Sequence, residues 1–250
     1  MSSYHTYQVG KIWLGASVNL SASAQVALVD CFHGDSEPGQ RALAGRAPVQ
    51  HAIISGIGPV VIKQYVRGGL LRYFRSTLHL RKFADRQRGG GRSEREFRVL
   101  ELVRALGIPA PEPIAFAWRG GGLYRAWLVT RQIEGHRTLA EVSRHDGEKA
   151  RILAKRLVPL LEQLIRNGIF HVDLHPGNVV VDANDQVFLL DFDKARIVSG
   201  REHEHLAERY LRRWRRAVIK HQLSEALTEV VCSSLRRRDL VSHAVSGEMR

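Results

Sequence analysis

The amino-acid sequence predicts an α+β protein, with an antiparallel sheet in its N-terminal part and mainly helices in its C-terminal part. Runs of β-branched and aromatic residues joined by glycine-containing turns are concentrated up to about residue 132. Beyond that point, leucines recur every three or four positions over long stretches, which is the period of an amphipathic helix. With 250 residues and 44% hydrophobic residues, the chain can bury a substantial core.

Two hairpins are predicted in the N-terminal part. Val49–Ile54 and Pro59–Tyr65 are β-branched runs, and the turn Ser55–Gly58 between them indicates two antiparallel strands. Ile114–Trp118 and Tyr124–Thr130 form a similar pair around a run of three glycines. These strands make up the predicted sheet.

A helix is predicted between the two hairpins. Ser93 is a suitable N-cap, and Gly107 ends the helix. The apolar positions between them recur at helical spacing: Phe97, Leu100, Val103 and Leu106. The segment 108–113 contains three prolines, which fix φ and remove backbone donors. We therefore expect this segment to be an ordered connector.

Three helices are predicted in the C-terminal part. Thr138 and Glu141 form a capping box that begins a short helix. A longer helix spans Gly147–Arg166 and ends at the Asn-Gly pair that follows. The third covers residues 203–221, with an apolar and a basic face. Its inward residues are Leu206, Tyr210, Trp214 and Val218, and its outward residues are Arg209, Arg212, Arg213, Arg215, Arg216 and Lys220.

The chain is strongly basic, with a formal net charge of +13. This charge favours nucleic acid, anionic lipid or phosphorylated small molecules as partners. Nine Lys or Arg residues lie between Arg67 and Arg95, against Asp85 and Glu94. No run approaches the roughly 18 apolar residues of a membrane-spanning helix. The two cysteines are too few for a disulfide framework, so we expect a reducing, cytoplasmic environment, and without a CxxC spacing they indicate no structural zinc site.

The densest group of chemistry-bearing residues lies between His171 and Asn178. Asp173 precedes Asn178 by five residues, and Asp191 follows an apolar hairpin. Phosphoryl transfer needs this set: one carboxylate as base toward the acceptor hydroxyl, and oxygen ligands for Mg²⁺. Two alternatives are a purely structural polar turn and a transition-metal site formed by His171, Asp173 and His175.

A kinase also needs a lysine on a central strand, paired with a helical glutamate. Lys63 follows two β-branched residues in a predicted strand, and Glu96 in the next helix is the best partner, with Glu94 as the fallback. The alternative places Lys63 on an edge strand facing water. As the phosphate loop we prefer Gly45 and Arg46, one strand before this hairpin, where small residues admit phosphate close to the backbone.

The spacing His171-x-Asp173-x-x-x-x-Asn178, followed by Asp191-Phe192, is similar to the catalytic loop and metal-binding pair of protein-kinase-like enzymes. Between about residues 45 and 221, the chain resembles the lipopolysaccharide core kinase family, especially 3-deoxy-D-manno-octulosonic acid (Kdo) kinases. The segments that carry the resemblance are Arg67–Leu70, Arg95–Arg98, Gly107–Pro111, His171–Asn178 and Leu190–Asp193.

The resemblance implies a protein-kinase-like, two-lobed fold in a single domain of residues 1–250. Residues 1–132 would form an antiparallel-sheet N-lobe with one αC-type helix, and residues 133–250 a reduced helical C-lobe. It also implies that Mg-ATP phosphorylates a Kdo hydroxyl of the lipopolysaccharide inner core. The enzyme would then be peripheral on the cytoplasmic face of the inner membrane.

The resemblance also implies a role for each site residue. Asp173 would act as the base, and His171 would position the catalytic loop. Asn178 and Asp191 would bind Mg²⁺. The ATP phosphates would be bound by Lys63, oriented by Glu96, and by the loop at Gly45 and Arg46.

The basic segment 67–95 then has an expected partner in an acidic glycolipid, the Kdo-lipid A precursor, at an anionic membrane surface. The segment carries no nucleic-acid motif, so we expect no nucleic-acid partner. The sequence identifies no protein partner. Alternatives are a kinase for heptose or another small molecule, such as an aminoglycoside, and an inactive nucleotide-binding or nucleic-acid-binding module.

Overall fold

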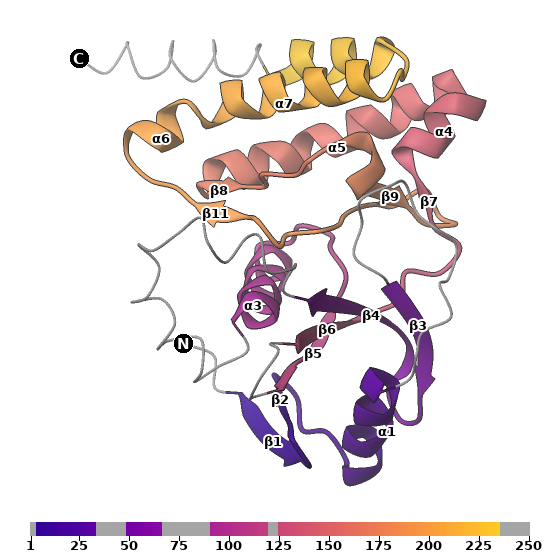
Figure 1. Ribbon diagram of the computed structural model, residues 1–250. Coiled ribbons are helices and arrows are strands. Elements are labelled where there is room, and N and C mark those ends of the chain that lie inside the picture. Colours follow the sequence, from indigo (N-terminus) through magenta and orange to yellow (C-terminus); the bar gives the residue numbers. More distant parts are fainter. Residues whose placement is uncertain (1–3, 34–48, 67–90, 120–124, 236–250) are drawn as a thin grey trace. The chain divides into compact units, whose positions relative to one another are not determined.

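The computed structural model describes residues 4–33, 49–66, 91–119 and 125–235 (Figure 1). The chain divides into two compact units, each described here by itself. Unit 1 comprises residues 1–101 and 111–132, and unit 2 comprises residues 102–110 and 133–250. Helices and antiparallel sheets occur together, which confirms the predicted α+β class. Both Gly45 and Arg46 lie outside the described residues.

Unit 1 is built on a six-stranded sheet in the order β1-β2-β5-β6-β4-β3. Every neighbouring pair of strands is antiparallel. The two predicted hairpins are confirmed as β3–β4 and β5–β6, and the start of the chain adds the hairpin β1–β2. The strands are β1 (His5–Val9), β2 (Ile12–Ala16), β3 (Val49–Ile54), β4 (Gly58–Val66), β5 (Pro113–Arg119) and β6 (Arg125–Arg131).

One face of this sheet packs against helix α1 (Ala22–His33), which the sequence analysis did not predict. Alternate residues point to opposite faces of a strand, so Ile62 of β4 and Trp127 of β6 contribute to the core on this side. Phe32 of α1 stacks on Trp127, with ring centroids 4.8 Å apart. The α1 side chains therefore close the apolar face of the sheet.

The first part of helix α3 (Arg92–Ala105) covers aromatic residues of the other face. Phe97 meets Phe116 of β5 edge to face, with centroids 5.1 Å apart. The expectation that Ser93 is the N-cap is wrong, because α3 begins at Arg92. Ser93 is buried, and its hydroxyl donates to the carbonyl oxygen of Ala117 at 3.3 Å. Its hydroxyl thus bonds to the backbone of strand β5.

Unit 2 is mainly helical, with two small sheets in the orders β10-β9-β7 and β11-β8. The predicted capping box of Thr138 and Glu141 is present, and the long predicted helix has the expected bounds. The elements are β7 (Arg137–Thr138), α4 (Leu139–His145), α5 (Gly147–Arg166), β8 (Ile169–Phe170), the 3-10 helix η3 (Pro176–Asn178), β9 (Val179–Val181), β10 (Val187–Leu189), β11 (Arg196–Ile197), α6 (Arg201–Glu204), α7 (Leu206–Lys220) and a helix over 226–235.

The third predicted helix is divided at His205 into α6 and α7. Its apolar stripe is buried as predicted, and Trp214 Nε1 donates to the carbonyl oxygen of Leu227 at 3.1 Å. Arg209 and Arg213, expected to face outward, are partly buried instead. They flank the stripe four residues apart, where a long side chain can lie along the protein surface. No helix among the described residues has the length and apolarity needed to cross a membrane.

We expect Gly168→Ala to destabilise unit 2 by about 3 kcal/mol. Gly168 has φ +64°, and a Cβ there would lie 2.5 Å from the carbonyl oxygen of Val198. That carbonyl cannot move freely, because the Val198 amide donates to the Gly168 carbonyl oxygen at 2.7 Å. Urea unfolding checks the value.

Gly107→Ala is the matched control, because Gly107 also has a positive φ, +77°, but its Cβ would meet no atom within 4 Å. It isolates the backbone strain, which costs about 1 kcal/mol. Equal losses of unfolding free energy in the two variants would contradict this prediction, because they would show that the Val198 carbonyl leaves enough room for a Cβ at position 168.

Candidate active site

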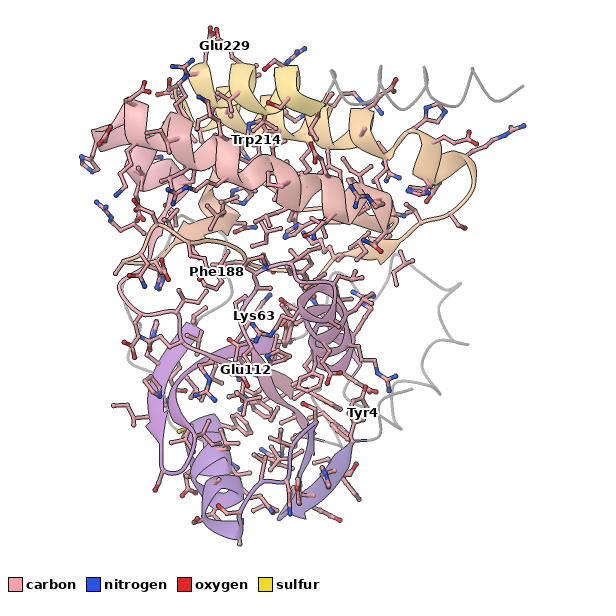
Figure 2. All side chains as sticks on the ribbon, turned by 180° about the vertical axis from the view of Figure 1, so that it is seen from behind. Tyr4, Lys63, Glu112, Phe188, Trp214 and Glu229 are labelled. Atoms are coloured by element: carbon pink, nitrogen blue, oxygen red, sulfur yellow. The ribbon has the colours of Figure 1, made fainter. Side chains whose placement is uncertain are left out.

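An ion pair within unit 1 joins the sheet to helix α3. Lys63 lies on β4, which is paired on both sides, with β6 and with β3. Its Nζ lies 3.1 Å and 2.9 Å from the two carboxylate oxygens of Glu96 on α3. Figure 2 labels Lys63 among the side chains of the sheet. The structure therefore brings together the predicted lysine and its preferred partner. The alternative of an edge-strand lysine facing water is wrong.

The carboxylate of Glu96 is held by more than this lysine. Glu96 is 2% exposed, and the hydroxyl of Tyr65 also donates to it. Tyr65 lies two residues after Lys63 on the same strand, so both side chains point to the face where α3 packs. The ammonium of Lys63 also lies 5.2 Å from the centroid of the Tyr65 ring. Lys63 is therefore fixed by a charge partner and an aromatic ring.

The catalytic-loop residues lie in unit 2, directly after β8. His171 is fully buried, and its Nε2 donates to the carbonyl oxygen of Leu190 at 2.7 Å. The Leu190 amide in turn donates to the carbonyl oxygen of Asn178 at 2.9 Å. Both backbone groups of Leu190 are thus bonded to the loop. These bonds hold Asp191, the next residue, beside the segment that carries Asp173 and Asn178.

A tyrosine of α7 fixes the start of the loop. The hydroxyl of Tyr210 accepts from the His171 amide at 2.7 Å and donates to the carbonyl oxygen of Ile169 at 2.8 Å. Burial raises the pKa of Tyr210 well above its ordinary value, so the hydroxyl keeps the proton that it donates. The buried side chains of α7 therefore contribute to the core, and Tyr210 among them also holds the start of the loop in place.

Burial lowers the pKa of His171 below its ordinary value of 6.5, although the bond to Leu190 opposes that shift. A neutral imidazole that donates through Nε2 carries no proton on Nδ1. His171 Nδ1 is buried and has no hydrogen-bond partner among the described residues. The side chain therefore links two parts of the site and stays uncharged.

We expect the stabilising contribution of His171 to weaken below about pH 6.5. Its pKa is lower in the folded than in the unfolded chain, so the unfolded chain binds more protons between the two values. Stability from this group is complete above the unfolded pKa and falls as the pH drops below it. Urea unfolding of the wild type and of His171→Gln, compared from about pH 8 to pH 5.5, measures the contribution. A constant difference between the two proteins would contradict it.

The amide of Asn178 is oriented by the loop itself. Its Nδ2 donates to the backbone carbonyl oxygen of Asp173 at 2.9 Å, so the oxygen end of the amide is directed away from that carbonyl. Asn178 is buried at the end of η3, where the Nδ1 of His175 accepts from the Gly177 amide at 3.1 Å. The 3-10 turn therefore sets the amide in one orientation.

Asp191 has a left-handed backbone, with φ 64°. This conformation is uncommon outside glycine, although aspartate adopts it more readily than most residues. Phe192 is fully buried against the His171 ring, with centroids 4.5 Å apart. Asp191 is thus anchored on both sides, through Leu190 and through Phe192.

Asn178 and Asp191 offer the oxygen atoms that suit Mg²⁺, which keeps several water or phosphate ligands and needs few protein side chains. These residues fit such an ion. The alternative transition-metal site of His171, Asp173 and His175 is not found, since the described residues contain no group of three or more His, Cys, Asp or Glu that could hold a metal.

Two cations bind the carboxylate of Asp173, and the sequence analysis missed both. Arg213 Nη2 lies 2.5 Å from Oδ1, and Lys194 Nζ lies 2.7 Å from Oδ2. A signal for Arg213 was present, because it lies three residues after Tyr210 and next to Trp214, at the border of the buried stripe. The sequence carried no comparable signal for Lys194.

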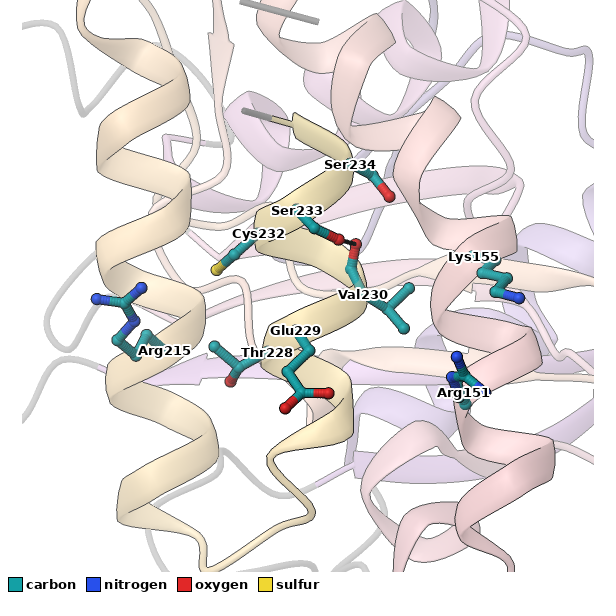
Figure 3. A pocket seen from close by; sticks show the side chains of 9 residues that line it. All are labelled: Arg151, Lys155, Arg215, Thr228, Glu229, Val230, Cys232, Ser233 and Ser234. Atoms are coloured by element: carbon teal, nitrogen blue, oxygen red, sulfur yellow. Dashed lines mark hydrogen bonds between the residues drawn. The ribbon is translucent and has the colours of Figure 1, made fainter. Parts of the chain in front are cut away.

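A separate pocket of about 630 Å³ lies on unit 2 and contains none of the predicted site residues (Figure 3). Its walls come from α5, with Arg151 and Lys155, from α7, with Arg215, and from the helix over 226–235 that lies between them. Glu229 adds a negative charge among these cations. This depression is therefore distinct from the catalytic loop.

The described site residues fall into two groups, each within one unit. Lys63 and Glu96 belong to unit 1, and the residues of the loop and of the Asp191 segment belong to unit 2. Within unit 1 the arrangement is a buried carboxylate that fixes a lysine. Within unit 2 it is a carboxylate, an amide and a second carboxylate on a rigid backbone, a set suited to phosphoryl transfer.

Comparison with known proteins gives the family. Residues 51–233 match the model of the lipopolysaccharide kinase (Kdo/WaaP) family, a range that includes all the described site residues. A 3-deoxy-D-manno-octulosonic acid kinase of Stenotrophomonas maltophilia is 32% identical over 188 residues, which cover 72% of this chain and 70% of that protein. The kinase of the same name from Xanthomonas axonopodis pv. citri is 34% identical over 166 residues, covering 65% and 63%. This chain is therefore a member of the lipopolysaccharide kinase (Kdo/WaaP) family.

Proposed function

We propose that this protein transfers the γ-phosphate of ATP to a hydroxyl of Kdo in the lipopolysaccharide inner core. The family match across residues 51–233, with relatives named as Kdo kinases, carries the proposal. The ion pair of Lys63 with Glu96 and the bonded loop around Asp173 support it, because both are parts that a phosphotransferase needs.

We further propose that the chain is one kinase-like domain. Residues 1–132 would be its N-lobe and residues 133–250 its C-lobe, with α3 as the αC-type helix. The six-stranded antiparallel sheet of unit 1 and the mainly helical content of unit 2 support this division. The helix α1 is an addition to the expected N-lobe with a single helix.

In this proposal Asp173 is the base. It accepts the proton of the acceptor hydroxyl as the oxygen attacks the γ-phosphorus, and ADP leaves. His171 holds the loop through Leu190 and transfers no proton, which agrees with its buried, neutral side chain. Lys63, fixed by Glu96, binds the ATP phosphates.

Asn178 and Asp191 would hold Mg²⁺, which when bound neutralises the charge on the phosphates. The bonds from Asn178 to Asp173 and from Leu190 to Asn178 would keep the two oxygen donors in place. The proposed phosphate-binding backbone at Gly45 and Arg46 belongs to the undescribed segment 34–48, so it rests on the sequence.

The proposed acceptor is Kdo-lipid A, and we propose that the enzyme works as a peripheral protein on the cytoplasmic face of the inner membrane. The net charge of +13 supports contact with anionic lipid. The basic segment proposed for this contact is described from residue 91 onward, and its residues 67–90 lie outside the described part.

The test is transfer of labelled γ-phosphate from Mg-ATP to three acceptors: Kdo-bearing lipid A precursor, heptosylated core and an aminoglycoside. We expect label on the Kdo lipid and none on the aminoglycoside. Label on heptose alone would move the acceptor to a neighbouring sugar of the core. Failure to bind ATP would favour an inactive module, and ATP binding without label on any of the three would favour a kinase for another small molecule.

A further inference from the structure

The carboxylate proposed as the base lies between two cations from different segments. Arg213 projects from α7, and Lys194 follows Asp193 in the chain. Each binds a different oxygen of Asp173, at 2.5 Å and 2.7 Å. Any hydroxyl that approaches Asp173 therefore arrives beside a guanidinium and an ammonium group.

All three side chains are accessible to a ligand. The exposed fractions of the side chains are 24% for Asp173, 34% for Arg213 and 59% for Lys194. An ammonium with that exposure can turn toward a ligand without breaking core packing, because its stem has several rotatable bonds. The cations are thus accessible at the place where the acceptor must bind.

Arg213 has unused donor capacity. Its Nε is buried and has no hydrogen-bond partner among the described residues. A buried N–H without an acceptor is unfavourable unless something supplies one. Nη2 of the same guanidinium already binds Asp173, so a second carboxylate would be bound by the exposed part of the guanidinium or would share the Nε–Nη2 fork with Asp173.

We propose that Lys194 and Arg213 form a binding site for the carboxylate of the acceptor sugar, next to the hydroxyl that Asp173 activates. This inference rests on the proposed function. Kdo is a sugar acid, and its negative charge gives these cations a partner that a neutral sugar lacks. The pair would therefore select the acid acceptor over heptose.

The alternative is that the same cations stabilise the charge of the phosphoryl group during its transfer, as cations do in many phosphotransferases. That role would be indifferent to the charge of the acceptor. The two roles can be separated by removing either the cation or the acceptor carboxylate.

The experiment measures kcat/KM on Kdo-bearing lipid A precursor and on the same lipid with the Kdo carboxylate converted to a primary amide. For the wild type, we expect the amide to be about 10- to 100-fold poorer, mainly through KM for the lipid. We expect Arg213→Gln and Lys194→Gln each to lose about tenfold or more on the acid and little on the amide. KM for ATP should not change.

Arg216→Gln is the matched control, since Arg216 is an exposed arginine on the same helix. It should discriminate between acid and amide as the wild type does. If Arg213→Gln folds poorly, Lys194→Gln still tests the inference, because Lys194 is exposed and replacing it disturbs little packing.

Equal losses on acid and amide would overturn the inference, because they would show that the cations act on Asp173, which both of them bind, or on the phosphoryl group. A wild type that uses both lipids equally well would also overturn it. If the wild type labels neither lipid, the proposed function itself fails. The failure of the inference and that of the function are therefore distinct results.

Discussion

Replacing Asp173 with asparagine should lower kcat for phosphate transfer by about a hundred- to ten-thousand-fold, the usual contribution of a general base. The amide keeps one of the two oxygens that Arg213 and Lys194 bind, but it cannot take the proton of the acceptor hydroxyl. ATP binding should be nearly unchanged, because the proton transfer follows nucleotide binding. Steady-state transfer of labelled phosphate gives kcat, and binding of a fluorescent ATP analogue gives the affinity.

Asp185→Asn is a suitable control for this variant. Asp185 lies in the turn between β9 and β10 with φ 59°, a conformation that asparagine also tolerates. Its carboxylate forms an ion pair with Lys149 at 2.7 Å. We expect wild-type kcat from this control. Wild-type kcat from Asp173→Asn would remove Asp173 from the chemistry.

Replacing Lys63 with methionine should have the second largest effect, on both activity and stability. Losing one charged group that stabilises the transferring phosphate typically costs about a hundred- to a thousand-fold in kcat. The same change leaves the buried carboxylate of Glu96 without its ammonium partner, which should lower the free energy of unfolding by about 3 kcal/mol. Urea unfolding and steady-state kinetics measure the two losses separately.

The double variant Lys63→Met, Glu96→Gln separates folding from chemistry. A glutamine at position 96 carries no charge and still offers an oxygen to the Tyr65 hydroxyl. We therefore expect the double variant to recover most of the stability that Lys63→Met loses and none of its lost activity. If the double variant recovered its turnover as well as its stability, Lys63 would be needed for folding and not for catalysis.

Much of the site could be predicted because its signals are local. The spacing of Asp173 and Asn178 is fixed by a single short turn, so a linear pattern describes it fully. Lys63 could be assigned to a strand from its β-branched neighbours, and Glu96 to a helix from apolar periodicity. Their contact at 2.9 Å follows from α3 packing on the sheet face that carries Lys63.

Other features depend on contacts that no linear pattern records. The narrow apolar stripe of α7 predicts an outward position for Arg213, yet its side chain binds Asp173, 40 residues earlier. Ser93 has the residue type of a cap, but the neighbouring strand provides the carbonyl of Ala117 for its hydroxyl. In both cases tertiary contacts decided between two local possibilities.

Helix α1 was missed for a different reason. Residues 22–33 contain three alanines and a leucine, but also one serine, two valines and the run Asp30–His33, whose helix propensity is modest. The helix is stabilised by packing on the sheet through Leu28 and Phe32. Propensity alone is a weak guide where burial supplies most of the stability.

The central claim, phosphate transfer to Kdo, is tested most directly by mass spectrometry of Kdo-bearing lipid A precursor after incubation with Mg-ATP and the wild-type protein. The account predicts that the lipid gains one phosphate group on its Kdo fragment and that Asp173→Asn leaves the lipid unmodified. Phosphate on the lipid A fragment, or an unmodified lipid with folded wild-type protein, would contradict it.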